Sequence, residues 1–292
     1  MRFAHTMRRV GTSVGLRPIS NLRKDFRVSV ASASVQGARR TPQHRDHVNA
    51  LGNGLQVIEC FSAAAPALTI ADVARKSGLT RAAARRYLVT LTTLGYMEFD
   101  GKHYRLSTRT ARLGYAYFST APLPKLAQPI LERVADVTQE GVSLAVLDGS
   151  DVIYIGRSSA RRIMSSVVGV GVRIPAVIGG TGRVLLASKP DELVERMLRN
   201  IGTIPLLTAK TKTDRDEVLE EIRLARQQGY SINHEEVEIG LRSIAAPVRN
   251  ATGSTIAAMS VSTPTARLSA AQLVESVLPV LLEACHDLGV TV

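Results

Sequence analysis

Residues 69–96 constrain the fold of this chain more than any other segment, because they carry two helix signals joined by a Ser-Gly turn. Thr69 and Asp72 have a spacing close to that of a capping box at the start of the first helix. Thr80 is placed to cap the second helix, and Gly95 is placed to end it. The pattern predicts a helix-turn-helix unit.

The second helix of this unit has an apolar face and a basic face on a helical wheel. The residues expected to face the core are Ala84, Tyr87, Leu88, Leu91 and Leu94. The opposite face carries Arg81, Ala82, Arg85, Arg86, Val89 and Thr92. Arginines in the first two turns suit contacts with phosphates or with guanine in the major groove, and the alanines allow close approach. An ordinary solvated cationic face is the alternative interpretation.

A short hairpin follows the second helix, with two strand patterns on either side of a polar turn at residues 100–102. A hairpin in this position is a wing, and Lys102 and Arg105 place positive charge where it meets the DNA backbone. Together with an apolar helix upstream, residues 51–106 are predicted to form a winged helix-turn-helix domain. The expected DNA-binding residues are Thr80, Arg81, Ala82, Arg85, Arg86, Lys102 and Arg105.

Positive charge is concentrated at the N-terminal end of the chain. The formal charge is +12, of which residues 1–50 contribute +8, residues 51–106 contribute +3 and residues 107–292 contribute +1. This asymmetry is typical of a nucleic-acid-binding front joined to a module with another task. We interpret residues 1–50 as a disordered basic arm or as the product of an upstream start codon, although their composition also resembles an organelle transit peptide.

Cysteine and histidine usage excludes several classes of site. Cys60 and Cys285, the only two cysteines, lie in apolar helical patterns and are expected to be buried thiols in a reducing, cytoplasmic setting. Neither the pair His44 and His47 nor His234 has further ligands at a metal-site spacing, so no metal or cofactor is expected. No apolar run is long enough to span a bilayer.

Behind the winged domain, residues 107–122 are predicted to form a linker and dimerisation helix with Leu113 and Tyr117 on its apolar stripe. A proline-rich break at residues 121–124 is expected to close this helix and act as a hinge. The next helix is expected over residues 125–140, with the apolar positions Leu126, Ile130, Val134 and Val137.

Residues 123–292 alternate between helical and strand patterns, and several strands are linked by hairpin turns. This order predicts an α+β domain with a mixed or antiparallel sheet. The strands are expected at residues 142–147, 152–155, 163–168, 170–177, 243–249 and 255–262. Two further helices are expected at residues 214–228 and 269–288.

The glycine-rich turn Gly179–Gly182 precedes a helical run at residues 183–187. Unpaired N–H groups at such a helix start are able to bind a carboxylate or phosphate, although close helix–strand packing is an equally simple reason for the glycines. The surrounding sequence matches neither a P-loop nor a dinucleotide fingerprint. Five polar residues are candidates for the same pocket, and the alternative interpretation is that they serve only as turns, caps or solvent-facing strand positions. They are Asn233, Glu236, Ser243, Ser260 and Ser262.

Several separated segments resemble the IclR-type transcriptional regulators and occur in the expected order from about Leu51 to Leu288. Beside the winged domain they are residues 173–176, 179–187, 236–248, 257–264 and 267–269. Four segments are closer to the branch that controls aromatic-acid catabolism (protocatechuate, 4-hydroxybenzoate or β-ketoadipate), namely residues 68–74, 81–86, 113–117 and 161–164.

The resemblance implies a homodimer, or a dimer of dimers, that binds a palindromic promoter site and carries a GAF-like effector domain for a small organic acid. Ser243 stands where some members have Cys, and Asn233 where many have Asp, so the polar groups of the ligand are expected to differ. Carried over by position, the effector-binding residues are Ile174, Gly180, Thr181, Asn233, Leu241, Ser243, Ser260 and Ser262.

The sequence therefore predicts a ligand-responsive, DNA-binding transcriptional regulator. An enzyme is the first alternative, but no nucleophile–base pair or metal-ligand set with a recognisable spacing supports it. An architectural DNA-binding protein without a ligand is the second alternative, and calorimetric titration with aromatic and keto acids distinguishes it from a regulator.

Overall fold

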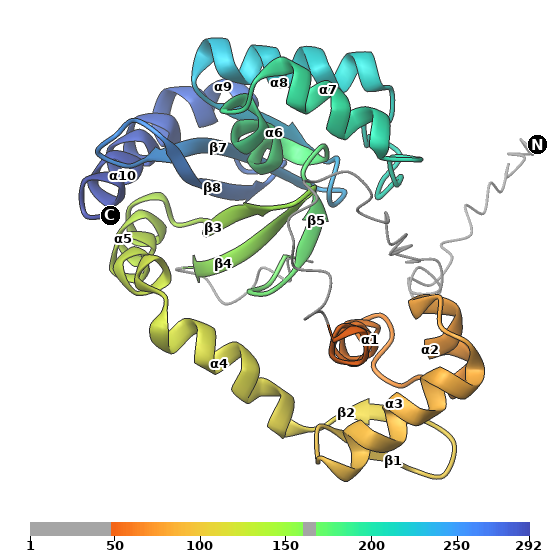
Figure 1. The fold of residues 1–292 in the computed structure, drawn as a ribbon. Helices are drawn as coiled ribbons and strands as arrows, with labels where there is room; N and C mark the ends of the chain where they lie inside the picture. Colours follow the sequence, from red (N-terminus) through yellow and green to blue (C-terminus); the bar gives the residue numbers. More distant parts are fainter. Residues whose placement is uncertain (1–47, 160–167) are drawn as a thin grey trace, which may run out of the picture.

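The computed structural model describes residues 48–159 and 168–292, which form a small helical region and a larger region built on a sheet (Figure 1). Most of the predicted basic arm lies outside the described residues. The strand predicted at residues 163–168 also lies outside them, apart from residue 168. So does the segment 161–164, which resembles the aromatic-acid branch of the family.

The N-terminal region consists of three helices and a hairpin around one apolar core. Its elements are α1 (Asn49–Glu59), α2 (Ile70–Ser77), α3 (Arg81–Thr93), β1 (Met97–Phe99) and β2 (Tyr104–Leu106). Thr69 caps α2 in a complete capping box with Asp72, and the Thr80 hydroxyl accepts a hydrogen bond from the N–H of Ala83. The predicted winged helix-turn-helix fold is therefore confirmed.

The predicted core face of α3 is correct except at its end. Ala84, Leu88 and Leu91 are buried, but the Leu94 side chain is 52% exposed. Leu94 is the C-cap of α3, and the chain turns there into Gly95, whose φ is +78°. Because the chain leaves the helix at this point, helical periodicity no longer decides where the side chain points.

A long connection leads from the hairpin to the sheet. It comprises the 3₁₀ turn η3 (Thr108–Thr110), α4 (Ala111–Thr120) and α5 (Pro122–Thr138). The break expected at residues 121–124 does end α4, but Ala121 alone separates α4 from α5, which begins at Pro122 and not at the predicted residue 125. A hinge between the domains at this point stays a prediction. Pro122 occupies the first position of α5, where its missing N–H leaves no hydrogen bond unmade.

The buried face of α5 differs from the predicted stripe. Leu126 and Val137 are exposed, whereas the buried residues are Pro124, Ala127, Leu131, Val134 and Ala135. Two neighbouring rows of apolar side chains run along this helix. The row that contains two alanines packs against the sheet, because small side chains allow the helix to approach the strands closely.

A six-stranded sheet forms the centre of the larger region, in the spatial order β5-β4-β3-β8-β7-β6. Every neighbouring pair is antiparallel, so the predicted α+β class is confirmed. Of the strand predicted at residues 170–177, only residues 173–175 pair with the sheet. The strands are β3 (Gly141–Asp148), β4 (Asp151–Ser159), β5 (Arg173–Pro175), β6 (Ser231–His234), β7 (Leu241–Arg249) and β8 (Thr255–Pro264).

Helices cover both faces of this sheet: α5 and α10 pack on one face, and α6, α7 and α8 pack on the other (Figure 1). The prediction did not include α7 or β6, and the expected closing helix contains a π-helical turn, η4. The bounds are α6 (Gly179–Ala187), α7 (Asp191–Asn200), α8 (Arg215–Gln228), α9 (Ala270–Gln272), η4 (Leu273–Val277) and α10 (Leu278–Val290).

Strand alternation gives the two faces of the sheet different chemistry. Val142, Leu144 and Met259 belong to the core beneath α5 and α10. The residues between them on the strands point to the opposite face, which α6 covers. That face combines small apolar residues with hydroxyl groups, namely Ala145, Ala245 and Ala258 and, beside them, Ser143, Ser243, Ser260 and Ser262.

Both cysteines are free and buried, as predicted. Burial raises the pKa of the Cys285 thiol to about 12. In the described part of the chain, no helix combines the length and apolarity of a membrane span. Residues 48–159 and 168–292 also contain no group of three or more His, Cys, Asp or Glu side chains that could hold a metal ion.

Gly289 lies where α10 packs against β7. A Cβ atom at this position would lie 1.9 Å from the carbonyl oxygen of Arg249, so Gly289→Ala is expected to force the helix away from the strand. We predict a loss of about 1–3 kcal/mol in the free energy of unfolding, the usual cost of overpacking, measured by urea denaturation.

Gly52→Ala in α1 is the matched control, because nothing lies within 4 Å of a Cβ atom at that position and it is outside the predicted dimerisation helix. Alanine favours the helix over glycine, so this variant should be neutral or more stable by up to about 1 kcal/mol. Equal destabilisation of the two variants would contradict the packing argument.

Candidate functional sites

The exposed face of α3 carries the basic residues that the sequence predicts to contact DNA. Thr80, Arg81, Ala82, Arg85 and Arg86 are all exposed. None of these arginines forms an ion pair within the described residues, whereas Arg75 of α2 is paired with Asp72. The charges on α3 are therefore available for phosphate or base contacts.

Asp100 organises the turn of the wing. Its Oδ1 accepts hydrogen bonds from the backbone N–H groups of Lys102 at 3.0 Å and His103 at 2.8 Å, and its Oδ2 pairs with Nη1 of Arg105 at 2.5 Å. The N–H of His103, together with Arg105 and the N–H of Lys102, holds the pKa of Asp100 well below its usual range. The ionised carboxylate offsets the charge of Arg105, so Lys102 carries the freer of the two predicted wing charges.

A set of contacts that the sequence analysis missed fastens α4 to the end of α3. The Ser107 hydroxyl donates to the carbonyl of Gly95 at 2.5 Å, and the Thr110 hydroxyl donates to the carbonyl of Tyr96 at 2.9 Å. The guanidinium of Arg109 lies 5.1 Å from the centre of the Tyr96 ring, a cation–π distance. These contacts join the recognition helix directly to the linker.

A cleft opens on the α6 face of the sheet, with about 530 Å³ of empty space, part of which is open solvent. Ser143 lies opposite Ser260 and Ser243 lies opposite Ser262 in the strand register, so four hydroxyl groups form one polar floor. The structure thus brings together six of the predicted effector-binding residues, Thr181, Asn233, Leu241, Ser243, Ser260 and Ser262.

Three other predicted residues do not line the cleft. Ile174 is buried in the apolar core between the sheet and α6–α8. A Cβ atom on Gly180 would lie 3.0 Å from the carbonyl oxygen of Ser231, so this glycine allows α6 to approach β6 closely. The carboxylate of Glu236 forms an ion pair with Arg183 instead of facing the cleft.

Five polar residues that the sequence analysis did not select also line the cleft: Ser143 of β3, Tyr154 and Arg157 of β4, Glu238, and Arg242 of β7. Burial raises the pKa of the Tyr154 hydroxyl, and the Thr181 side chain beside it offsets part of this increase. Tyr154 therefore remains a neutral hydroxyl at physiological pH. Arg157 donates to the carbonyl of Val168, and Arg242 donates through Nε to Nδ1 of His234 at 3.2 Å.

The position of Arg157 depends on a bulge between β3 and β4. Ala145 lies opposite Tyr154, but the register then shifts by one residue and places Ser143 opposite Arg157. Residues directly opposite each other in an antiparallel pair share a face, so the bulge brings both Tyr154 and Arg157 to the cleft although they are three residues apart. Strict alternation of side chains along β4 from the hairpin turn would place Arg157 on the opposite face from Tyr154.

The start of α6 adds backbone donors near the cleft. Its N-cap, Ile178, provides no side-chain hydrogen bond to the first turn, so the N–H groups there have no side-chain cap. Such a helix start favours an anion. Arg157 and Arg242 add two positive charges to the lining, against the single carboxylate of Glu238.

Asn233 offers hydrogen-bond donors to the cleft. Its Oδ1 accepts a hydrogen bond from the backbone N–H of Glu236 at 3.1 Å, which fixes the orientation of the amide. The Nδ2 group has no hydrogen-bond partner among the described residues, so it is the part of the side chain left for a ligand. A ligand group at this point must therefore be an acceptor, such as a carboxylate oxygen.

A winged helix-turn-helix unit with a free cationic helix face, joined to a domain with a polar cleft, defines a DNA-binding transcriptional regulator with a ligand-binding domain. The chain belongs to the IclR family of bacterial transcriptional regulators. Residues 50–101 match the family's helix-turn-helix domain, and residues 115–290 match its C-terminal domain.

Relatives of known role cover most of the chain. It is 38% identical to the Pca regulon regulatory protein of Pseudomonas putida, over 83% of this chain and 84% of that protein. It is 36% identical to the p-hydroxybenzoate hydroxylase transcriptional activator of Acinetobacter baylyi, over 83% of this chain and 91% of that protein. An IclR homologue from Microbacterium hydrocarbonoxydans, solved in complex with 4-hydroxybenzoate, is 27% identical with a TM-score of 0.66, over 82% of this chain and 97% of that one.

We predict that Arg85→Ala weakens binding to the specific promoter site by about 1–3 kcal/mol, the range for a base contact, because this exposed side chain lies on the central turn of α3. Binding to random duplex should fall much less. Fluorescence anisotropy with both duplexes at several salt concentrations measures the difference.

Arg75→Ala is the matched control, because that arginine is already paired with Asp72. If Arg85→Ala weakened binding to both duplexes equally, Arg85 would contact only phosphate.

Proposed function

We propose that this regulator senses an aromatic carboxylate of the hydroxybenzoate type, and that the cleft beneath α6 is the effector site. The observation that carries the proposal is that two arginines and the amide donors of Asn233 line one cleft, to which the first turn of α6 contributes Thr181. The names of the two relatives refer to p-hydroxybenzoate and the pca genes, and the Microbacterium homologue binds 4-hydroxybenzoate, which supports the same ligand class.

Each part of such a ligand has a matching group in the cleft. Its carboxylate would be bound by Arg157 or Arg242 and by backbone N–H groups. The ring would lie against the side chains of Val237 and Leu241, and ring substituents would contact the serine hydroxyls of the floor. The effector-binding residues proposed from position remain Thr181, Asn233, Leu241, Ser243, Ser260 and Ser262, and Arg157, Arg242 and Tyr154 join them.

The proposed mechanism is thermodynamic linkage in a cytoplasmic homodimer or dimer of dimers. Residues 51–106 bind one half of a palindromic operator, residues 107–122 join the protomers, and residues 123–292 bind the acid. An acid that binds one arrangement of the protomers better than another shifts the spacing of the winged domains toward or away from that of the operator.

Calorimetric titration of the full chain with 4-hydroxybenzoate, protocatechuate, benzoate and pyruvate tests the ligand class. Parallel binding curves on duplex from the protein's own upstream promoter region test the regulation. We expect saturable binding of at least one hydroxybenzoate and a change in DNA affinity in its presence. If no aromatic acid bound, or if pyruvate alone bound, the proposed ligand class would be wrong.

Thr181→Leu should abolish the effector response and leave DNA binding intact, because a branched apolar side chain would fill the cleft beside Tyr154. DNA-binding curves with and without 4-hydroxybenzoate measure this. Thr213→Leu, at an exposed position before α8, is the control for the substitution itself. A normal response in Thr181→Leu would place the ligand elsewhere.

Asn233→Asp should lower the affinity for 4-hydroxybenzoate at least about tenfold, because the new carboxylate keeps the bond to Glu236 with one oxygen and turns the other toward an anionic ligand. Calorimetry gives the dissociation constant. Unchanged affinity would mean that Asn233 does not contact the ligand.

A further inference from the structure

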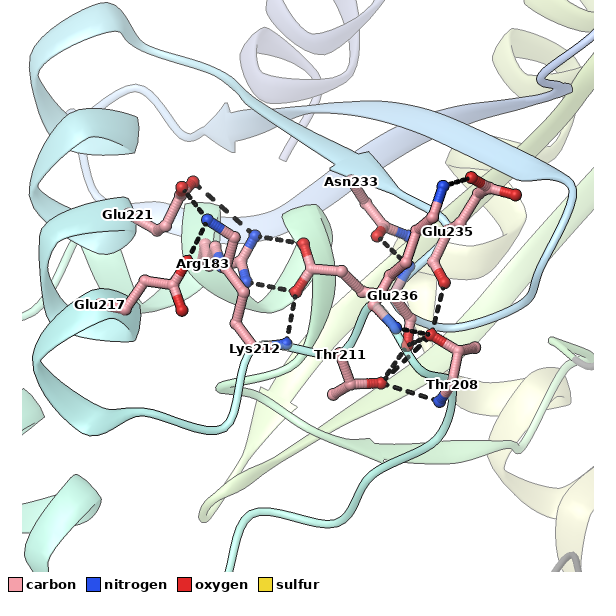
Figure 2. A network of polar contacts seen from close by, with 10 residues as sticks. Arg183, Thr208, Thr211, Lys212, Glu217, Glu221, Asn233, Glu235 and Glu236 are labelled. Carbon is pink, nitrogen blue, oxygen red and sulfur yellow. Dashed lines mark hydrogen bonds and ion pairs between the residues drawn. The ribbon is translucent and has the colours of Figure 1, made fainter.

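A buried ion pair lies on the side of α6 away from the cleft. Arg183 of α6 and Glu236, two residues beyond β6, form a bidentate pair in which Nη1 lies 2.8 Å from Oε1 and Nη2 lies 2.6 Å from Oε2 (Figure 2). Arg183 is completely buried and Glu236 is nearly so. The two residues are 53 positions apart in the chain, so the pair fixes the position of α6 relative to β6.

Glu236 also connects the pair to the effector cleft through its backbone. Its N–H donates to Oδ1 of Asn233 at 3.1 Å, and this bond sets which side of the Asn233 amide faces the cleft. Its carbonyl accepts from the Thr211 hydroxyl at 2.7 Å (Figure 2). Glu236 is thus held through its side chain, N–H and carbonyl at once.

The pair is poorly explained by stability alone. Removing two charges from water costs several kcal/mol per ion, and well-packed apolar residues often replace a buried pair without loss of stability. Nε of Arg183 is also buried without a hydrogen-bond partner among the described residues, which adds a further cost. A role in orienting nearby groups accounts for such a pair better.

We propose that Arg183 and Glu236 are positioning residues of the effector cleft. The ion pair holds the Glu236 backbone where its N–H fixes the Asn233 amide with its donors toward the ligand. It also fastens α6, whose first turn contributes Thr181 to the cleft, to the same point. The inference rests on the proposed function, because it concerns the same cleft, and neither residue contacts the ligand itself.

The surrounding charges allow the pair to be removed without changing the net charge of the cluster. Nη1 of Arg183 lies 3.8 Å from Oε2 of Glu221, and Lys212 pairs with both Glu217 and Glu221 (Figure 2). Arg183 and Glu236 carry opposite charges, so replacing them together does not change the net charge of this cluster, and Glu221 keeps its ion pair with Lys212. Replacement of one partner alone would leave a buried, unpaired charge and is expected to be strongly destabilising.

The test is the double variant Arg183→Met/Glu236→Leu in the full chain, compared with wild type. We expect its Tm to stay within a few degrees of wild type or to rise, its DNA binding to be unchanged, and its Kd for 4-hydroxybenzoate to rise at least about tenfold. The control is Arg133→Met/Asp287→Leu, which removes the half-exposed pair between α5 and α10 and should leave the ligand Kd unchanged. Wild-type affinity in a folded Arg183→Met/Glu236→Leu variant would overturn the proposal.

A second measurement does not depend on the ligand. The side-chain amide resonances of Asn233, identified by their loss in Asn233→Ser, should shift or broaden in Arg183→Met/Glu236→Leu and stay in place in the control. If wild type bound none of the aromatic acids, the proposed function would fail, whereas these resonances would still test the positioning role. Unmoved resonances would overturn it.

Glu236→Gln replaces the double variant if the latter does not fold. Glutamine keeps the side-chain length and one acceptor for Arg183, so this variant should show a smaller loss of affinity and a smaller shift of the Asn233 resonances. Wild-type values for both measurements in Glu236→Gln would then overturn the proposal.

Discussion

The close approach of the first turn of α6 to the surrounding backbone is the constraint on which the rest of the larger region depends. A Cβ atom on Gly182 would lie 2.0 Å from the carbonyl oxygen of Ala176, and one on Gly180 would lie 3.0 Å from that of Ser231. Position 182 therefore accepts only glycine, and a side chain at position 180 would push α6 away from β6 by a few tenths of an ångström. The position of α6 then determines where Thr181 lies in the proposed effector cleft.

The winged region was predictable because its signals are local. A capping box, a hydroxyl cap and a glycine stop each act within a few residues, and all three are formed in the structure. The polar floor of the cleft was predictable for a similar reason, since alternation along β7 and β8 places Ser243, Ser260 and Ser262 on one face once the strands are recognised. The error at Leu94 arose where helical periodicity ends.

The rest of the site depends on contacts that no local pattern encodes. Arg157 reaches the cleft only because a bulge shifts the register between β3 and β4. The partner of Arg183 is 53 residues away, and the sequence signals for Glu236 are equally consistent with a ligand contact. In α5 the row of side chains that is buried depends on the packing against the sheet. The buried row therefore lies about one residue further along the helix than the row predicted from the helix alone.

The same bulged strand that carries Arg157 also supports the linker. A Cβ atom on Gly156 would lie 2.9 Å from Cδ1 of Leu131, so α5 packs directly on β4 beside Arg157. From α5 the chain passes into α4 after a single residue, and α4 is fastened to the end of α3 through Ser107 and Thr110. A ligand alters DNA binding only if it binds two arrangements with different affinity. The packing of α5 on β4 therefore joins the strand that carries Arg157 to the linker, and the hydrogen bonds of Ser107 and Thr110 join the linker to the end of α3.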